Sequence, residues 1–257
     1  MILAIDIGNT NIVIGCIDAK QTYFVERIST NLSQTALEYA ITFKNILELY
    51  HINPRGLEGA ILSSVVPPIS NTVRLSVEKI IGKACLMVGP GLKTGLNILM
   101  DNPAAVGSDL VVTAVAGIRE YKAPFLVIDM GTATTITCID KNRNYIGGAI
   151  IPGVRVSLES LSQKAAQLHN ISLEPPRHAI GKNTTECMRS GVVLGSASML
   201  DGMIDRFAKE LGEEPTVLAT GGLSKIIIPH CRHKIIIDDG LLLKGLWIIY
   251  TKNQQNP

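Results

Sequence analysis

The sequence predicts an α/β protein made of two similar halves. The main observation is an internal repeat, because residues 5–18 are echoed by residues 128–140. Each copy has an apolar strand ending in Asp-x-Gly, then small polar residues, then a strand rich in β-branched residues, which is the pattern of a β-hairpin. Strands and helices alternate after both copies. With 46% hydrophobic and 18% charged residues, the 257-residue chain can form a sizeable core.

The first half continues from its hairpin through a regular series of elements. Apolar spacing and turn residues predict a helix, a strand, a helix and a strand, in that order. Their expected bounds are residues 33–50, 59–66, 70–81 and 84–88. We expect this half to end near residues 102–121, where a helix would cross to the other half.

The second half follows with a comparable series. Its hairpin leads into a Gly-Pro-rich segment, two helices, two strands and a closing helix. Their expected bounds are residues 147–153, 154–169, 184–211, 216–219, 234–237 and 240–250. We therefore predict an N-terminal lobe of residues 1–115 and a C-terminal lobe of residues 116–257, each a mixed sheet flanked by helices.

Composition and charge argue against several classes of protein. The formal net charge is +2 and the Lys and Arg residues are scattered among acidic ones, so we expect no nucleic-acid partner. The first residues resemble a core strand and not a signal peptide, and no apolar run approaches the roughly 18 residues of a membrane helix. The five cysteines lack a Cys-x-x-Cys pair and fit free thiols in the cytoplasm. Residues 230–233, His-Cys-Arg-His, are interpreted as a surface turn, not a metal site.

The hairpin tips carry groups that suit the phosphates of a nucleotide. Asp6 ends the first strand and would bind Mg²⁺, Gly8 lets the backbone approach a ligand, and residues 9–11 supply amides and a hydroxyl. The second copy repeats the carboxylate at Asp129 and offers hydroxyls over residues 132–135. Either tip alone also fits an ordinary β-turn. Two matching tips favour two phosphate-binding loops, with a nucleotide expected between the two lobes.

A third segment of small residues follows a predicted strand. Residues 219–224, Ala-Thr-Gly-Gly-Leu-Ser, would let an adenosine lie against their backbone, although they also fit a plain strand-to-helix turn. The chain has no Gly-x-x-x-x-Gly-Lys-Ser/Thr sequence, so its phosphate site is not a P-loop.

Asp109 is the candidate catalytic base. Gly107 and Ser108 stand at the expected start of a helix, where free N–H groups favour an anionic substrate, and Asp109 falls in its first turn. Its alternative role is to complement the helix dipole. In a loose phosphoryl-transfer transition state the proton leaves late, so orienting the attacking hydroxyl matters more than basicity.

Taken together, these residues resemble the type III pantothenate kinases of the actin-like ATPase superfamily. The matching segments run in order along the whole chain, at residues 6–11, 63–67, 107–109, 129–135, 147–153 and 219–223. The resemblance implies the duplicated ribonuclease H-like fold of that superfamily. It also implies ATP-dependent phosphorylation of pantothenate to 4'-phosphopantothenate, the first step of coenzyme A biosynthesis, by a cytoplasmic homodimer that binds no membrane.

The resemblance also assigns roles to particular residues. Asp109 would be the general base, Thr184 would contact pantothenate, and Asp129 would hold a monovalent cation, K⁺ or NH₄⁺. The rest of the pantothenate site would be Gly107, Ser108 and Leu110. ATP, with Mg²⁺, would contact Asp6, Ile7, Gly8, Asn9, Thr10, Asn11, Ile12, Val13 and Thr132.

Two positions depart from the family pattern. Many members have Arg where this chain has Leu110, and Tyr where it has Met100. An Arg there would be a bidentate partner for the pantothenate carboxylate. Either another cation, such as Arg155 or Lys182, takes that role, or the acceptor is another small hydroxy acid or a sugar. A non-catalytic regulatory homologue is a third alternative, against which the retained carboxylates Asp6, Asp109 and Asp129 argue.

Overall fold

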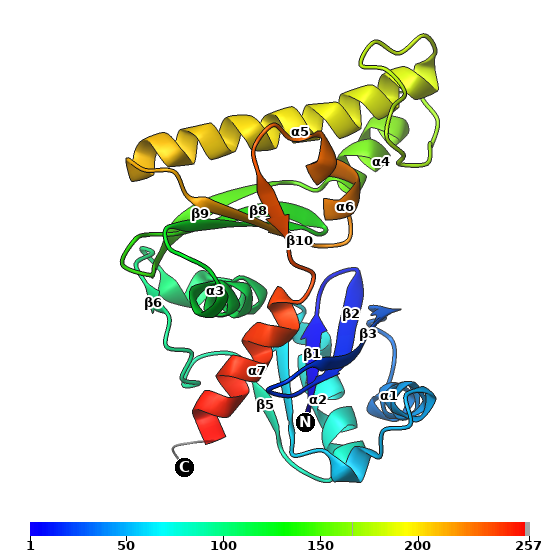
Figure 1. Ribbon diagram of the computed structural model, residues 1–257. Coiled ribbons are helices and arrows are strands. Elements are labelled where there is room, and N and C mark those ends of the chain that lie inside the picture. The colour runs from blue at the N-terminus through cyan, green and yellow to red at the C-terminus, as the bar shows by residue number, and fades with distance from the viewer. Residues whose placement is uncertain (166, 255–257) are drawn as a thin grey trace. The chain divides into compact units, whose positions relative to one another are not determined.

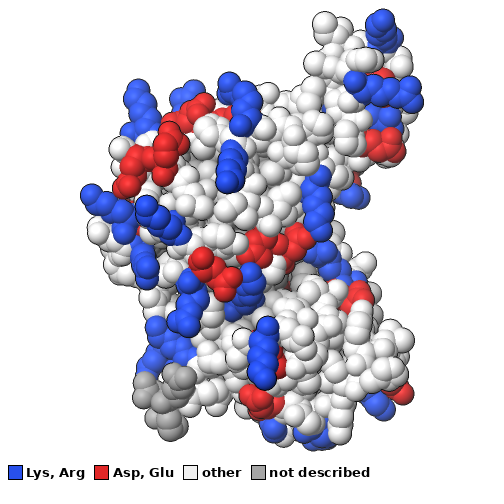
Figure 2. Space-filling model, viewed as in Figure 1, with Lys and Arg blue, Asp and Glu red and all other residues white. Residues whose placement is uncertain are grey.

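The computed structural model describes residues 1–165 and 167–254. The chain forms two compact units. The first contains Met1–Leu96, Asn102–Arg119 and Gly240–Pro257, and the second contains Asn97–Asp101 and Glu120–Asp239. Within the described residues, every helix is too short or too polar to cross a membrane. Basic and acidic side chains are interspersed on the face shown in Figure 2.

The first unit is built on a mixed five-stranded sheet. Its strand order is β3-β2-β1-β4-β5, with β1 antiparallel to β2 and parallel to β4. The strands are β1 (Ile2–Ile7), β2 (Asn11–Ile17), β3 (Thr22–Ser29), β4 (Ala60–Ser64) and β5 (Cys85–Met87). Because side chains alternate along a strand, β1 contributes Leu3 and Ile5 to the core on one face and Ile2 and Ala4 to the core on the other.

Helices cover both faces of this sheet (Figure 1). The face of Leu3 packs against α1 (Ala36–Leu49) and α2 (Pro67–Ile81). The face of Ile2 packs against α3 (Ser108–Glu120) and α7 (Leu241–Gln254). Two short 3₁₀ turns, η1 (Pro54–Gly56) and η2 (Pro103–Ala105), complete the unit.

The second unit has a mixed six-stranded sheet with the order β11-β10-β7-β8-β9-β6. Its strands are β6 (Asn97–Ile98), β7 (Phe125–Met130), β8 (Ala133–Ile139), β9 (Asn144–Pro152), β10 (Thr216–Thr220) and β11 (Ile235–Ile237). The helical elements are α4 (Val154–Lys164), α5 (Thr184–Leu211), α6 (Ser224–Ile227) and η3 (Ile228–His230). The long α5 lies along one face of the sheet (Figure 1), where Val193 and Ala197 pack on Leu126 and Ile128 of β7.

The internal repeat is confirmed by the registers of the strands. β1 and β2 form an antiparallel pair, as do β7 and β8, and each pair continues into a third antiparallel strand. A register shift falls at Cys16/Ile17 in the first copy and at Cys138/Ile139 in the second. The two hairpins are therefore equivalent elements of two related sheets.

The structure differs from the sequence prediction at several elements. Strand β3 is absent from the predicted elements, and the helix expected over residues 154–169 ends at Lys164. Residues 147–153 were expected as a Gly-Pro-rich segment with no strand assigned, but most of them belong to β9. The closing helix was expected in a C-terminal lobe of residues 116–257, but α7 belongs to the first unit. The cause is packing, because Leu243, Leu246 and Ile249 of α7 join the core beside β1.

Candidate active site

The tip of the first hairpin is closed by backbone hydrogen bonds. The Gly8 N–H donates to the Asn11 carbonyl oxygen at 3.0 Å, and the Thr30 N–H donates to the Thr10 carbonyl oxygen at 3.0 Å. Thr30 Oγ1 also donates to the Gly8 carbonyl oxygen at 2.6 Å. The side chains of Asn9, Thr10 and Asn11 are exposed at this tip, where they can reach a ligand.

Asp6 lies at the end of β1 just before this tip and is only 8% exposed. Ser63, its parallel neighbour on β4, donates a hydrogen bond from Oγ to Asp6 Oδ1 and so orients the carboxylate. Mg²⁺ at phosphate sites takes one or two carboxylates, with water and phosphate as its other ligands, so Asp6 fits that ion. Among the described residues, no group of three His, Cys, Asp or Glu side chains could hold a metal.

The start of α3 is fastened to the end of β4 through Ser108. Its Oγ accepts a hydrogen bond from the Ser64 N–H at 3.0 Å and donates one to the Ser64 carbonyl oxygen at 3.0 Å. Ser64 Oγ accepts hydrogen bonds from Ser70 Oγ at 2.7 Å and from the Val66 N–H at 3.1 Å. This network holds the first turn of α3, and therefore Asp109, in a defined position.

Asp109 lies in the first turn of α3, as predicted, and is half-buried. Its Oδ1 accepts the Leu110 N–H at 2.8 Å and lies against Gly107, where an added Cβ would come within 2.5 Å of it. Burial raises the pKa of Asp109 above the ordinary value for Asp, against the opposing effect of the hydrogen bond from Leu110. The raised pKa makes this carboxylate a better proton acceptor than an exposed Asp.

The second hairpin has a similarly closed tip. The Gly131 N–H donates to the Ala133 carbonyl oxygen at 3.0 Å, and Thr132 is exposed at the turn. Gly153, after β9, lies so close to this turn that an added Cβ would stand 2.1 Å from the Thr132 carbonyl oxygen. Only glycine fits there, so β9 supports the backbone of the tip.

Asp129 is the counterpart of Asp6 in the second unit. It pairs with Thr135 of β8 on one side and with Thr220 of β10 on the other. Gly221 has a φ of +93°, and an added Cβ there would stand 2.7 Å from Asp129 Oδ1. The turn over residues 219–224, expected to face an adenosine, therefore begins beside Asp129.

Two neighbouring threonines of β8 carry unusual hydroxyl groups. The hydroxyl oxygens of Thr134 and Thr135 are buried and make no hydrogen bond to any described residue. Successive side chains of a strand point to opposite faces. Thr135 therefore shares the face of Asp129, while Thr134, which pairs with Met130 and Ile151, faces the α5 side. Buried polar groups are normally paired, so these two hydroxyls need an explanation.

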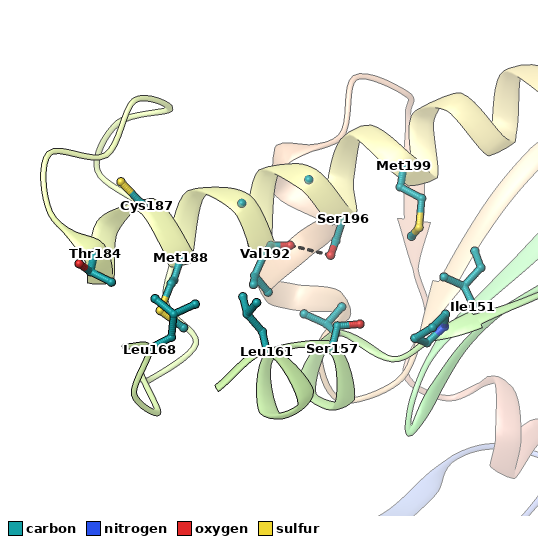
Figure 3. Close-up of a pocket in the computed structure, with 14 residues that line it drawn as sticks. Ile151, Ser157, Leu161, Leu168, Thr184, Cys187, Met188, Val192, Ser196 and Met199 are labelled. Atoms are coloured by element: carbon teal, nitrogen blue, oxygen red, sulfur yellow. Dashed lines mark hydrogen bonds between the residues drawn. The ribbon is translucent and has the colours of Figure 1, made fainter. Parts of the chain in front are cut away.

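Thr184 is the first residue of α5 and is exposed. The helix is capped by Asn183, whose side chain accepts the Glu186 N–H at 2.9 Å, so the Thr184 side chain is not the N-cap of α5. Thr184 lies at one end of a groove of about 640 Å³ between α4 and α5 (Figure 3). The groove is mostly apolar and its lining includes Leu161, Leu168, Met188, Val192 and Met199.

The residues considered as replacements for the missing Arg lie in the second unit. Arg155 in α4 and Lys182 before α5 are both exposed, and neither forms an ion pair with a described residue. Met100 is 38% exposed and packs beside Gly147. Leu110 is half-buried in α3 of the first unit.

The cysteines are free thiols, as expected, and most of residues 230–233 lie in a turn that follows η3. All five cysteines are free, and burial raises the pKa of the Cys16 and Cys85 thiols to about 12. Residues 231–234 form a turn before β11, with Arg232 exposed. The turn is held by buried Asp201, which accepts the Arg232 and His233 N–H groups at 2.9 Å and 3.1 Å.

Comparison with known proteins identifies the relatives of this chain. A family model described as type III pantothenate kinase matches residues 2–206. Curated proteins named type III pantothenate kinase from Exiguobacterium sp. and Bacillus cytotoxicus are 44% identical over 255 residues and 41% identical over 253 residues. These matches cover 99% and 98% of this chain, and 100% and 97% of the relatives.

Solved structures share the fold at low sequence identity. A Campylobacter jejuni protein, whose structure was named for the Baf family of transcriptional activators, has a TM-score of 0.61 at 19% identity, covering 99% of this chain and all of its own. The ROK hexokinase of Thermus thermophilus has a TM-score of 0.54 at 13% identity, covering 99% of both chains. The predicted fold class, the duplicated α/β fold of actin-like ATPases, is confirmed.

Proposed function

Because the chain belongs to the type III pantothenate kinase family, we propose that it phosphorylates pantothenate with ATP to give 4'-phosphopantothenate, at the first step of coenzyme A biosynthesis. It is thus a phosphotransferase with an alcohol as acceptor. The observation that carries the mechanism is Asp109, a half-buried carboxylate with a raised pKa at the fastened start of α3.

The first hairpin binds the ATP phosphates in this proposal. Residues 6–13 form this site with the exposed side chains of Asn9, Thr10 and Asn11 at its tip, and Thr132 of the second hairpin assists. Asp6, oriented by Ser63, holds Mg²⁺. When bound, that ion neutralises charge on the transferring phosphoryl group.

Asp109 accepts the proton of the pantothenate hydroxyl as that oxygen attacks the γ-phosphorus. The bond between the γ-phosphorus and the bridging oxygen breaks, and ADP leaves. Since the fixed position of Asp109 orients the hydroxyl before attack, much of its contribution is geometric. Burial supports the second part of its role, because it raises the pKa and favours acceptance of the proton.

Gly107, Ser108, Leu110 and Thr184 contact the acceptor in this proposal. The N-terminal turn of α3 presents N–H groups to the pantothenate carboxylate, which suits an anion. Leu110 offers an apolar contact in place of a bidentate Arg. Arg155 and Lys182 are the cations proposed to pair with the carboxylate, since both are exposed and make no ion pair with a described residue.

Asp129 holds a monovalent cation, K⁺ or NH₄⁺. The residues present fit such an ion, because Asp129 stands opposite Thr135 on one face of the sheet and the buried Thr135 hydroxyl makes no hydrogen bond to a described residue. A carboxylate and a hydroxyl are hard oxygen donors of the kind such ions accept. The proposal also includes a cytoplasmic location and a homodimer. Light scattering should give twice the chain mass of 27.6 kDa, and a monomer would contradict the homodimer.

An acceptor screen tests the proposed function. The purified protein is incubated with MgATP, KCl and either pantothenate or one of a panel of sugars and hydroxy acids, and the products are identified by mass spectrometry. We expect 4'-phosphopantothenate as the main product. Rapid phosphorylation of another acceptor with pantothenate inert would overturn the substrate assignment, and no phosphorylation of any acceptor would overturn the enzyme itself.

A further inference from the structure

We infer that the Thr135 hydroxyl is a ligand of the monovalent cation beside Asp129. This inference rests on the proposed function for the presence of the cation. It adds an oxygen donor from β8 to a site that otherwise has only the Asp129 carboxylate assigned to it.

The sheet register brings the two residues together. Asp129 of β7 and Thr135 of β8 stand directly opposite each other in an antiparallel pair, so their side chains share one face of the sheet. Such pairs have Cβ atoms about 4.5–5.5 Å apart. Asp129 Oδ1 lies over Gly221, whose missing Cβ would stand only 2.7 Å away. Glycine thus leaves room for the carboxylate on the side away from Thr135.

The internal repeat shows what is particular to this pair. In the first copy, the residue opposite Asp6 is Val13, an apolar side chain, and the hydroxyl that reaches Asp6 comes from Ser63. In the second copy, the residue opposite Asp129 is Thr135. The two hairpins share their backbone plan, but only the second places a hydroxyl at this position.

That hydroxyl lacks a hydrogen-bond partner among the residues that the structure describes. Thr135 Oγ1 is buried and makes no hydrogen bond to any residue in the described ranges 1–165 and 167–254. A Thr in this position offers a neutral oxygen with free lone pairs beside a carboxylate. A single carboxylate with neutral oxygens balances one positive charge, whereas no cluster of three acidic, His or Cys side chains is found among the described residues for a more highly charged ion.

The matched control is Thr134. Its hydroxyl is also buried without a partner among the described residues, but it belongs to the opposite face of β8. Thr135→Val and Thr134→Val are nearly isosteric changes that each remove one such hydroxyl. Thr135→Val also introduces the residue type that the first copy of the repeat has at the equivalent position, Val13. Thr135→Ser keeps the hydroxyl and serves as the rescue.

The test is a titration of thermal unfolding with KCl. The full chain, with Mg²⁺ and a non-hydrolysable ATP analogue, is titrated at constant ionic strength with choline as the replacing cation. The wild type should gain Tm with K⁺. Thr135→Val should raise the half-saturating K⁺ concentration about 10-fold or more, the range seen when a group supporting a metal site is removed. Thr134→Val and Thr135→Ser should stay within about threefold of the wild type.

Each contrary result has a separate meaning. An unchanged K⁺ midpoint in Thr135→Val would overturn the inference while leaving the cation at Asp129. An equal loss in Thr134→Val would also overturn it, because the effect would then not depend on the face of the sheet. A wild type that responds equally to K⁺ and choline would remove both the cation and the Thr135 ligand, although pantothenate phosphorylation could still be detected by mass spectrometry.

Discussion

Gly107→Ala would separate the position of the Asp109 carboxylate from its chemistry. An added Cβ at residue 107 would stand 2.5 Å from Asp109 Oδ1 and 3.6 Å from Val65 Cγ1. The distance to Val65 Cγ1 is an ordinary van der Waals contact, but the distance to Asp109 Oδ1 is too short to be tolerated. Because the carboxylate is the free end of a short side chain, it can move while the helix backbone stays in place. To reach a contact of about 3.5 Å, it must shift by about 1 Å.

A shift of that size predicts a large kinetic effect and a small effect on stability. Misplacing a reacting group by about 1 Å costs on the order of 100-fold in rate, so kcat for pantothenate phosphorylation should fall about 100-fold. The KM for ATP should not change, since the first hairpin is untouched. The free energy of unfolding should change by less than about 1 kcal/mol, because Ala restricts the unfolded chain. A coupled ADP assay and urea denaturation measure these quantities.

Gly56→Ala is the matched control in the same unit, because an added Cβ at Gly56 meets nothing within 4 Å. It should keep wild-type kcat. If Gly107→Ala also kept wild-type kcat, the position of the Asp109 carboxylate would not limit the reaction. If Gly107→Ala instead lost more than about 2 kcal/mol of stability, the backbone of α3, not the carboxylate, would have given way.

Three further predictions concern stability. Asp109→Asn should raise Tm at neutral pH, because burial raises the pKa of Asp109 and the ionised carboxylate therefore destabilises the folded state. Calorimetry should show that this gain in Tm disappears below about pH 4, where Asp109 is protonated in the unfolded chain too. A lower Tm at neutral pH would contradict the prediction. Ser108→Ala removes two hydrogen bonds to Ser64 and should cost about 1–3 kcal/mol in urea denaturation, whereas no loss would show that this contact does not hold α3. Asp201→Ala leaves the partly buried N–H groups of Arg232 and His233 without their acceptor and should cost about 1–3 kcal/mol. Burial opposes ionisation of Asp201, but the hydrogen bonds to its carboxylate outweigh burial and lower its pKa. The stability that Asp201 contributes is therefore present above about pH 4 and should be lost as the pH falls through the pKa of the folded state. A difference in stability between Asp201→Ala and the wild type that does not depend on pH would argue against this role.

The repeated hairpins could be predicted because their signal is local. Asp6 and Asp129 each end an apolar strand, and the small residues after them allow only a tight turn before the next strand. The start of α5 was predictable for a similar reason, since Asn183 and Thr184 follow a polar loop and precede a long helical pattern. Such features depend on neighbours in the chain, which the sequence displays directly.

Strand β9 could not be predicted because glycine occurs both in loops and in strands that approach each other closely. Gly147, Gly148 and Pro152 suggest a loop when read along the chain. In the structure, an added Cβ at Gly148 would stand 2.0 Å from the Ile136 carbonyl oxygen, so glycine here allows two strands to approach closely. The need for glycine at this position comes from contact with the partner strand, which a local sequence pattern does not show.

The placement of α7 could not be predicted for a related reason. Its apolar residues would suit either sheet, and only the tertiary structure selects one. Gly245 allows α7 to pack closely against α3 of the first unit, because an added Cβ would stand 2.0 Å from the Val112 carbonyl oxygen. The buried hydroxyl of Thr135 is equally invisible in the sequence, since Thr is common in strands whether or not its hydroxyl has a partner.

A single-turnover measurement on Asp109→Asn tests whether Asp109 is the general base of phosphoryl transfer. Enzyme in excess over ATP is mixed with saturating pantothenate, and 4'-phosphopantothenate is followed by rapid quench, while ATP binding is measured separately by calorimetry. We predict that phosphoryl transfer slows by about two to four decades while the Kd for ATP changes by less than about threefold. A transfer rate within about fivefold of the wild type would contradict the assignment of Asp109 as the group that accepts the proton of the attacking hydroxyl.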